Sequence, residues 1–201
     1  MKKFIVIAAV AASLATSSAF AKTEGNYVGI DFLKTSSTNR YQVHGSKSSS
    51  YGAFDNTSDG VGLNYKHAMN FDQIFVAPGV FFDRLGAESK DQSGRTVTTN
   101  SRYGAKLDLG YDLTETFSAY FTNGLANVNY STNTASAGGR GSSSKIGYFY
   151  GAGLINKISK DLSLVVEYNT QTLNIPTSAL ANADHVKSKL GVAKLGLAYN
   201  F

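Results

Sequence analysis

The stretch that decides the fold alternates between two kinds of residue and reads Tyr103-Gly104-Ala105-Lys106-Leu107-Asp108-Leu109-Gly110-Tyr111-Asp112-Leu113. Every odd position is apolar or aromatic, and every even position is Gly, Lys or Asp. A period of two places the two kinds on opposite faces of a β-strand. Segments 162–169 and 195–201 repeat the alternation. We therefore expect β-structure with one apolar and one polar face.

Eight segments of this kind are predicted along the chain, at 26–35, 60–69, 73–85, 102–113, 117–131, 146–158, 162–173 and 187–201. Four connections are long and rich in Ser, Thr, Asn and Gly, near 36–59, 86–101, 132–145 and 174–186. The other three are tight. Because long and short connections alternate, the long loops all fall at one end. The register of the fifth segment stays open, because a bulge there would change which face is polar.

The first residues predict a cleaved secretory signal at 1–21, with Lys2 and Lys3 as its basic start and Ala19-Phe20-Ala21 as its end. Its apolar run is too short for a membrane-spanning helix. The 201-residue chain has no Cys and a net charge of +5. The missing Cys excludes a disulfide scaffold, a thiolate zinc site and a cysteine nucleophile. Residues 22–201 fit a single domain.

The polar face carries small and charged residues, which suit the narrow lumen of a barrel. The expected lumen charges are Asp31, Lys66, Asp83, Lys106, Asp108, Glu167 and Lys194. The opposite face, such as Val28, Ile30 and Phe32, suits lipid. Backbone groups in lipid must all be paired, so the strands should close. The sequence thus predicts an all-β fold, an eight-stranded antiparallel transmembrane β-barrel with up-and-down topology.

Two further features support this fold. Tyr103 and Tyr111 bracket the apolar face of the quoted stretch at a spacing of about 20 Å, close to a lipid-facing band of about 25 Å. Phe75, Phe81 and Phe149 should point inward, which excludes a wide aqueous pore. Whether the lumen conducts ions stays open. The expected location is the outer membrane of a Gram-negative bacterium, at the cell surface.

The end of the chain alternates toward an aromatic terminus through Leu195, Leu197, Tyr199 and Phe201. With the signal, the eight segments and the four long loops, the chain resembles small outer-membrane barrels of the OmpA and OmpX type. The resemblance implies that this end is the assembly signal used by the outer-membrane barrel assembly machinery. Segments 75–83 and 110–113 look like the short rickettsial surface antigens classed as adhesins. That similarity implies attachment to host cells and capture of host proteins such as vitronectin.

Long loops on a rigid scaffold are where binding residues concentrate. The candidates are loop aromatics and cations that could contact a host-cell or serum protein, or lipopolysaccharide phosphates. They are Arg40, Tyr41, Lys47, Tyr51, Phe54, Arg95, Arg140 and Lys145. A structural envelope-maintenance barrel and a narrow channel are the alternatives. The ligand, the loop conformations and the oligomeric state stay open.

No catalytic, cofactor or metal site is predicted, and the expectation is that the protein is not an enzyme. The loop residues that could attack lipid are His44 with Ser46 and Ser48, and Asp184 with His185. No spacing fixes a nucleophile, a base and an orienting acid together. His67 is interpreted as an interfacial residue. No nucleic-acid recognition module is present, so nucleic acid is excluded as a partner.

Overall fold

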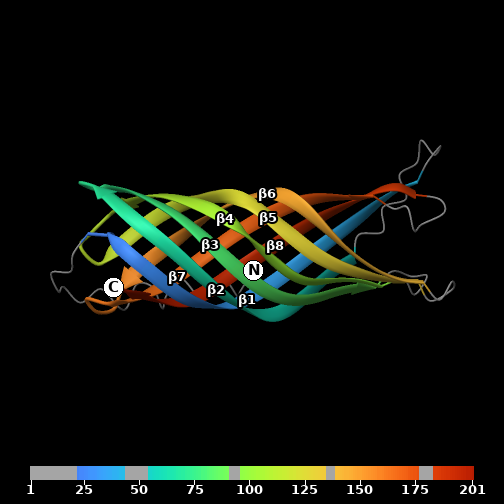
Figure 1. Ribbon diagram of the computed structural model, residues 1–201, viewed down its shortest axis with the longest axis horizontal. Helices are drawn as coiled ribbons and strands as arrows, with labels where there is room; N and C mark the ends of the chain where they lie inside the picture. The colour runs from blue at the N-terminus through green and yellow to red at the C-terminus, as the bar shows by residue number, and fades with distance from the viewer. Residues whose placement is uncertain (1–21, 44–53, 91–95, 135–138, 177–182) are drawn as a thin grey trace.

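The computed structural model describes residues 22–43, 54–90, 96–134, 139–176 and 183–201. Its eight strands pair in sequence order and β8 returns to β1, so the antiparallel sheet closes as a barrel (Figure 1). The strands are β1 (Gly25–Val43), β2 (Phe54–Phe71), β3 (Ile74–Lys90), β4 (Thr96–Asp112), β5 (Phe117–Thr134), β6 (Gly139–Lys157), β7 (Leu162–Pro176) and β8 (Ala183–Asn200). The predicted eight-stranded meander is confirmed. The predicted signal, 1–21, lies outside the described residues.

Across the described ranges, no helix is long and apolar enough to span a membrane.

Three short turns close one end of the barrel, at 72–73, 113–116 and 158–161. We call it the turn end, and the opposite end the outer end. Asp72 has a φ of 67°, in the left-handed region that Asp tolerates better than most residues. The described chain also starts and finishes here, where the Phe201 amide donates to the Asn26 carbonyl at 3.0 Å. The tight connections lie where the sequence predicts them, within two residues.

Toward the outer end, the strands are longer than predicted. β1 continues to Val43 and β6 begins at Gly139, so much of each predicted long loop is strand. The rest of those predicted loops, 44–53, 91–95, 135–138 and 177–182, lies outside the described residues. The ladder continues because backbone pairing does not require an apolar face. The alternation that marks a strand in the sequence therefore ends before the strand does.

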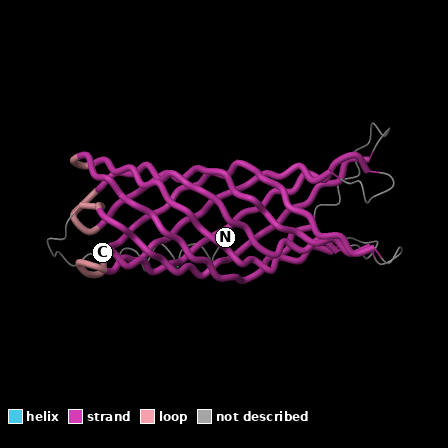
Figure 2. The backbone as a smooth tube through the Cα atoms, viewed as in Figure 1, coloured by secondary structure: helices cyan, strands magenta, loops and turns pink. Residues whose placement is uncertain are grey.

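Two of the eight ladders stop early. The β2–β3 ladder ends at Val61 opposite Arg84, and the β6–β7 ladder ends at Phe149 opposite Gln171. The other six continue to the outer end. The outer end therefore divides into two four-stranded sheets, β7-β8-β1-β2 and β3-β4-β5-β6. Figures 1 and 2 show the two groups of strands parting at the right.

Side chains alternate between lumen and exterior as predicted. Val28, Ile30 and Phe32 are exposed on the outer wall, whereas Gly29 and Asp31 between them are buried. The same alternation places Tyr103, Tyr111 and the leucines between them outside. The lipid-facing and lumen-facing assignments of the sequence are therefore correct on these strands.

The fifth strand keeps one phase, which resolves the register that the sequence left open. Its ladder with β6 is uninterrupted, and the irregularity lies in its ladder with β4. Its asparagines face outward and donate locally, Asn127 Nδ2 to Tyr103 Oη at 2.7 Å and Asn129 Nδ2 to Ser101 Oγ at 3.2 Å. Because these asparagines form hydrogen bonds with neighbouring side chains, they can lie on the outer face of β5. The sequence alone therefore did not show which face of this strand points into the lumen.

The lumen is filled in layers. An apolar cluster near the turn end contains Tyr27, Ala68, Phe75, Ala77, Tyr120, Ile155 and Ala198. Another lies toward the outer end and contains Leu33, Leu85, Leu190 and Val192. Phe81 and Phe149 pack edge to face with ring centroids 5.4 Å apart. The predicted inward phenylalanines are thus confirmed, and charged side chains lie between the two apolar clusters.

Candidate functional site

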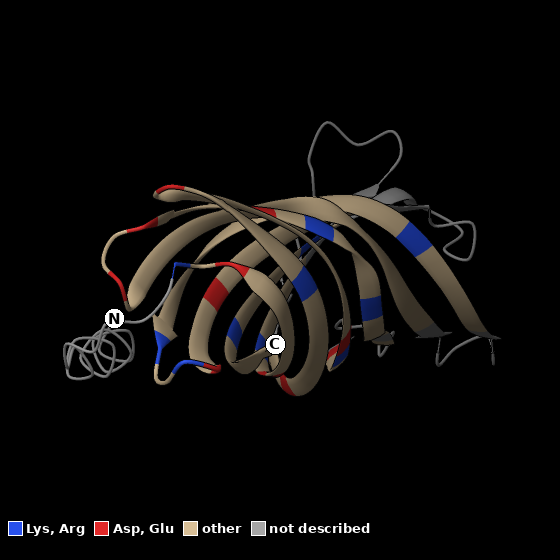
Figure 3. Cartoon of the chain, turned by 60° about the vertical axis from the view of Figure 1, so that its left-hand side comes forward, with Lys and Arg blue, Asp and Glu red and all other residues tan. Residues whose placement is uncertain are grey.

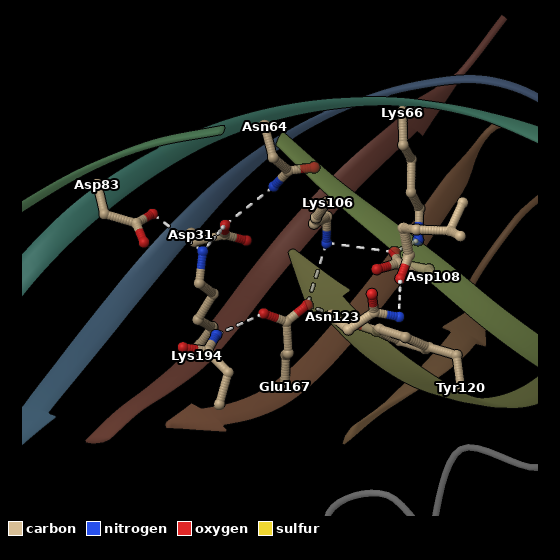
Figure 4. A network of polar contacts seen from close by, with 12 residues as sticks. Asp31, Asn64, Lys66, Asp83, Lys106, Asp108, Tyr120, Asn123, Glu167 and Lys194 are labelled. Atoms are coloured by element: carbon tan, nitrogen blue, oxygen red, sulfur yellow. Dashed lines mark hydrogen bonds and ion pairs between the residues drawn. The ribbon is translucent and has the colours of Figure 1, made fainter. Parts of the chain in front are cut away.

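The charged layer is built from lumen-facing residues of six strands. Figure 3 marks charged positions on the strand ribbons, and Figure 4 shows the contacts within the layer. At one side of it, Glu167 of β7 pairs with Lys106 of β4, with Oε2 and Nζ 3.1 Å apart. Tyr120 Oη donates to the same Oε2 at 2.8 Å, and Asn169 Nδ2 donates to Oε1 at 2.7 Å. Three donors from three strands therefore hold one buried carboxylate.

Asp108 links this group to β2. Its Oδ2 lies 3.2 Å from both Lys106 Nζ and Lys66 Nζ. The Lys66 ammonium also lies 4.9 Å from the centre of the Tyr120 ring, within the range of a cation–π contact. Four buried charges in one chain of contacts, from Lys66 through Asp108 and Lys106 to Glu167, tie β2, β4 and β7 together across the lumen.

The second half of the layer centres on Asp83 of β3. Arg102 Nε binds Asp83 Oδ2 at 2.8 Å, and Lys194 Nζ binds Oδ1 at 2.9 Å. Lys194 also lies 3.6 Å from Asp31 Oδ2, which accepts a hydrogen bond from Asn64 Nδ2 at 2.9 Å. All seven predicted lumen charges therefore lie inside the barrel and take part in one network.

Arg102 was missed as a lumen residue. It is completely buried, its Nη1 donates to Asn169 Oδ1 at 2.8 Å, and its guanidinium lies 5.2 Å from the centre of the Phe81 ring. The signal that would have found it was present, because Arg102 has the same parity as Lys106 and Asp108 on the same strand. With it, four cations face four anions, so the layer is balanced.

This arrangement fills the barrel. A cavity of about 10 Å³ remains between Asp31, Lys66, Lys106, Tyr120 and Glu167. It has room for about one water molecule. Phe75, Arg102 and Phe149 are among the largest side chains inside the barrel and are at most 1% exposed. Among the described residues, the lumen therefore holds a packed polar core rather than a passage for solutes.

A second cluster closes the turn end, and sequence reasoning did not find it. Asp112 accepts hydrogen bonds from the Thr23 amide at 3.1 Å, Thr23 Oγ1 at 2.6 Å, Ser118 Oγ at 2.6 Å and Asn70 Nδ2 at 2.9 Å. Thr23 is completely buried as a result. The contact joins residues 89 positions apart, which no local pattern marks. The segment before β1 is thus held across the barrel mouth.

The predicted ligand residues are spread over the outer end, and most lie on strands rather than loops. Arg40 and Tyr41 lie on β1, opposite Lys187 and Val186 of β8. The remaining candidates are Phe54 at the start of β2, Arg140 and Lys145 on β6, and Lys47, Tyr51 and Arg95, which lie outside the described residues. Of the eight side chains only that of Lys145 is described, and it is exposed.

The residues weighed for catalysis are not brought together by any described contact. His44, Ser46 and Ser48 lie outside the described residues. Asp184 and His185 lie on β8 rather than in a loop. Among described side chains, no group of three or more His, Asp and Glu has the arrangement of a metal site.

Two predicted surface features are placed on the outer wall. His67 is exposed near the turn end, with its Nδ1 3.0 Å from Asn26 Oδ1. The residues of the predicted assembly signal all face outward, Leu195, Leu197, Tyr199 and Phe201. Their role in assembly stays a prediction.

A closed sheet with an apolar exterior and a packed, charged lumen defines a transmembrane β-barrel. Residues 6–201 match the family model described as outer membrane protein beta-barrel domain. The chain belongs to this family and is a protein of the Gram-negative outer membrane. Sequence comparison with curated proteins finds no match.

Solved structures of the same fold are similar to the whole barrel. Ail of Yersinia pestis, in complex with the heparin analogue sucrose octasulfate, has a TM-score of 0.54 and 18% identity, covering 88% of this chain and 99% of Ail. Neisserial surface protein A has a TM-score of 0.56 and 16% identity, covering 88% and 97%. OprG of Pseudomonas aeruginosa has a TM-score of 0.54 and 14% identity, covering 90% and 98%. These likenesses establish the fold.

Proposed function

We propose that this barrel is a surface adhesin whose outer end binds host-cell or serum proteins. The proposal rests on one observation, which is that the strands extend beyond the lipid-facing band at the outer end. On β1 the outward apolar series ends at Phe32, yet the strand runs on to Val43. Eleven residues at about 3.3 Å each, tilted by about 40°, extend roughly 25–30 Å beyond the lipid-facing band. The turn end has no comparable extension among the described residues.

The chemistry of the projection supports an acidic partner. Among the described side chains, Arg84, Lys145 and Lys189 are exposed there against one exposed acid, Glu88, while Lys34 is paired with Asp59 at 2.7 Å. An excess of cations attracts acidic protein or polysaccharide surfaces and lipopolysaccharide phosphates. The heparin analogue bound by Ail is also a polyanion, which supports the idea that a barrel of this shape presents such a surface.

The finer assignments rest on the sequence. The proposed contact residues are the eight outer-end candidates named above, and the resemblance to rickettsial adhesins makes vitronectin the first host protein to test. We also propose that 195–201 is the segment read by the barrel assembly machinery. No enzymatic activity is part of the proposal. Lipid hydrolysis by the purified barrel that disappeared in His44→Ala would contradict this.

Display on a non-adherent Gram-negative strain tests the proposal. Cells carrying the barrel should gain binding to cultured host cells and to immobilised vitronectin, and deleting 44–53 or combining Arg140→Glu with Lys145→Glu should reduce it. Lys160→Glu is the control for position, because it reverses one exposed cation, half the charge change of the double variant, in a turn at the other end. Protease treatment of intact cells should cut only at the outer end. A displayed barrel that confers no binding would refute the adhesin proposal.

A purely structural barrel is the second candidate, favoured by the filled lumen. It predicts no host binding, and a channel would instead show steady conductance in planar bilayers. The packed charged layer leads us to expect no steady current.

A further inference from the structure

Where the outer end divides into two sheets, four strand edges lack a neighbouring strand among the described residues. Three of them carry features that oppose pairing with an added strand. The β2 edge, 54–60, carries Asp55 and Asp59. The β3 edge is bent at Gly86, whose φ of 62° accompanies the shift in its ladder with β4. Ser58 Oγ donates to the carbonyl of Leu85 there at 2.7 Å. The short β7 edge ends at Pro176. Charge, bulges and Pro are the usual protection of an edge.

The fourth edge, 139–148 of β6, is long and regular. Its ladder with β5 runs without a shift from Phe117 opposite Asn156 to Thr134 opposite Gly139. Pairing with β7 stops at Phe149, and Gln171 Nε2 donates to the Gly147 carbonyl at 3.0 Å, just where the ladder ends. Along a strand, alternate residues direct their backbone groups to opposite neighbours. Half of the amides and carbonyls of 139–146 therefore face the split between β6 and β7.

The surroundings of this edge are open and outside the lipid-facing band. The odd-numbered and the even-numbered residues of 141–146 are all exposed. Neither face of this part of the strand is therefore covered by described residues. Ile146 and Tyr148 are 67% and 52% exposed and are the first large apolar residues of β6 on the outer wall. The part of the edge before them, 139–145, consists of Gly, Arg, Ser and Lys. Within the described residues, it is therefore a water-facing strand with one side unpaired.

We propose that 139–145 of β6 binds an extended, acidic polypeptide segment of a partner protein as an added β-strand. The backbone supplies the hydrogen bonds, as in other cases of strand addition. The charge selects the partner, because 139–148 contains Arg140 and Lys145 and no Asp or Glu. A second copy of the same edge would bring like charges together, which disfavours self-pairing. This inference deepens the proposed adhesin function by naming the surface and the partner chemistry.

Amide hydrogen exchange of the full chain in lipid nanodiscs tests the proposal, with synthetic eight-residue peptides as probes. An alternating valine–glutamate peptide should slow exchange at alternate amides of 139–145. The valine–lysine peptide should bind about tenfold more weakly or worse. N-methylation of alternate peptide amides should abolish the protection if backbone bonds carry the binding. No host cell is involved, so this test can fail while adhesion persists, and adhesion can fail while it succeeds.

Ser142→Pro and Ser143→Pro separate strand addition from side-chain contact. Adjacent residues direct their amides to opposite sides, so one variant loses a donor to β5 and the other loses a donor to the split. The second should lose peptide protection with an unchanged unfolding midpoint, and the first serves as its control. Protection that survives in both variants, falls on another strand or persists with the N-methylated peptide would overturn the proposal. Protected 139–145 amides and a dimer without peptide would overturn it in favour of self-pairing.

Discussion

Replacing Lys106 by methionine is expected to destabilise the barrel by about 3–5 kcal/mol, because it leaves a buried carboxylate without its paired cation. The Lys106 side chain is 7% exposed, and its Nζ lies 3.1 Å from Glu167 Oε2 and 3.2 Å from Asp108 Oδ2. Asp108 keeps Lys66 at 3.2 Å, whereas Glu167 keeps only neutral donors among the contacts described above. Methionine has nearly the same length as lysine, so the loss reports charge rather than a cavity.

A second substitution separates the cost of the unpaired Glu167 charge from the loss of the other Lys106 contacts. Glu167→Gln in the Lys106→Met background removes the stranded charge and keeps most of the shape. The double variant should therefore be more stable than the sum of the single losses predicts, with a coupling of about 1–3 kcal/mol. Lys160→Met is the matched control, because this lysine is exposed in a turn and its loss should be nearly neutral.

Urea unfolding in lipid vesicles, followed by far-ultraviolet circular dichroism, measures these differences. The chain has 12 Tyr and no Trp, so tryptophan fluorescence cannot be used. An unchanged midpoint for Lys106→Met, or strictly additive losses in the double variant, would refute the reasoning that the lumen charges form one coupled network.

Three further outcomes follow from other parts of the barrel. Leu107→Arg places a charge on the lipid-facing wall and should cost about 2–4 kcal/mol in the same unfolding assay, and a neutral result would contradict the assignment of that face to lipid. Gly110→Leu should impair folding, since a Cβ at Gly110 would overlap the Phe75 ring, and adding Phe75→Ala should restore part of the folded fraction seen by semi-native electrophoresis. Asp112→Ala should release the segment at Thr23, seen as faster exchange of its amide, and an equally protected amide would mean that other contacts hold the segment.

Much of the fold could be predicted from the sequence because lipid and lumen impose opposite demands on alternate residues. Because of that contrast, the alternation in the sequence is enough to place Lys106 and Leu107 on opposite faces of the strand. The contrast weakens outside the lipid, because the outward face there meets water and is polar, while the inward face also carries small polar residues such as Thr35 and Ser37. The continuation of β1 to Val43 and the start of β6 at Gly139 therefore had no signal in the alternation.

The charged layer was predicted by parity, and Arg102 could have been found by the same rule. Its pairing could not be predicted, because the partners come from strands distant in sequence. The Lys194 contact to Asp83 spans 111 positions, and the Arg102 contact to Asn169 spans 67. Such contacts depend on barrel closure and strand stagger, which a single strand does not encode.

The seam between β1 and β8 gives the barrel a particular order of assembly. It runs from Tyr27 opposite Asn200 to Val43 opposite Ala183, so the two ends of the sequence meet along the whole length of the wall. Until the last strand is in place, the sheet has two free edges, which lipid does not tolerate. Loop closure over almost the entire chain makes this step slow. Insertion is therefore expected to be all-or-none, and a chain that lost β8 would lose the barrel rather than one wall of it.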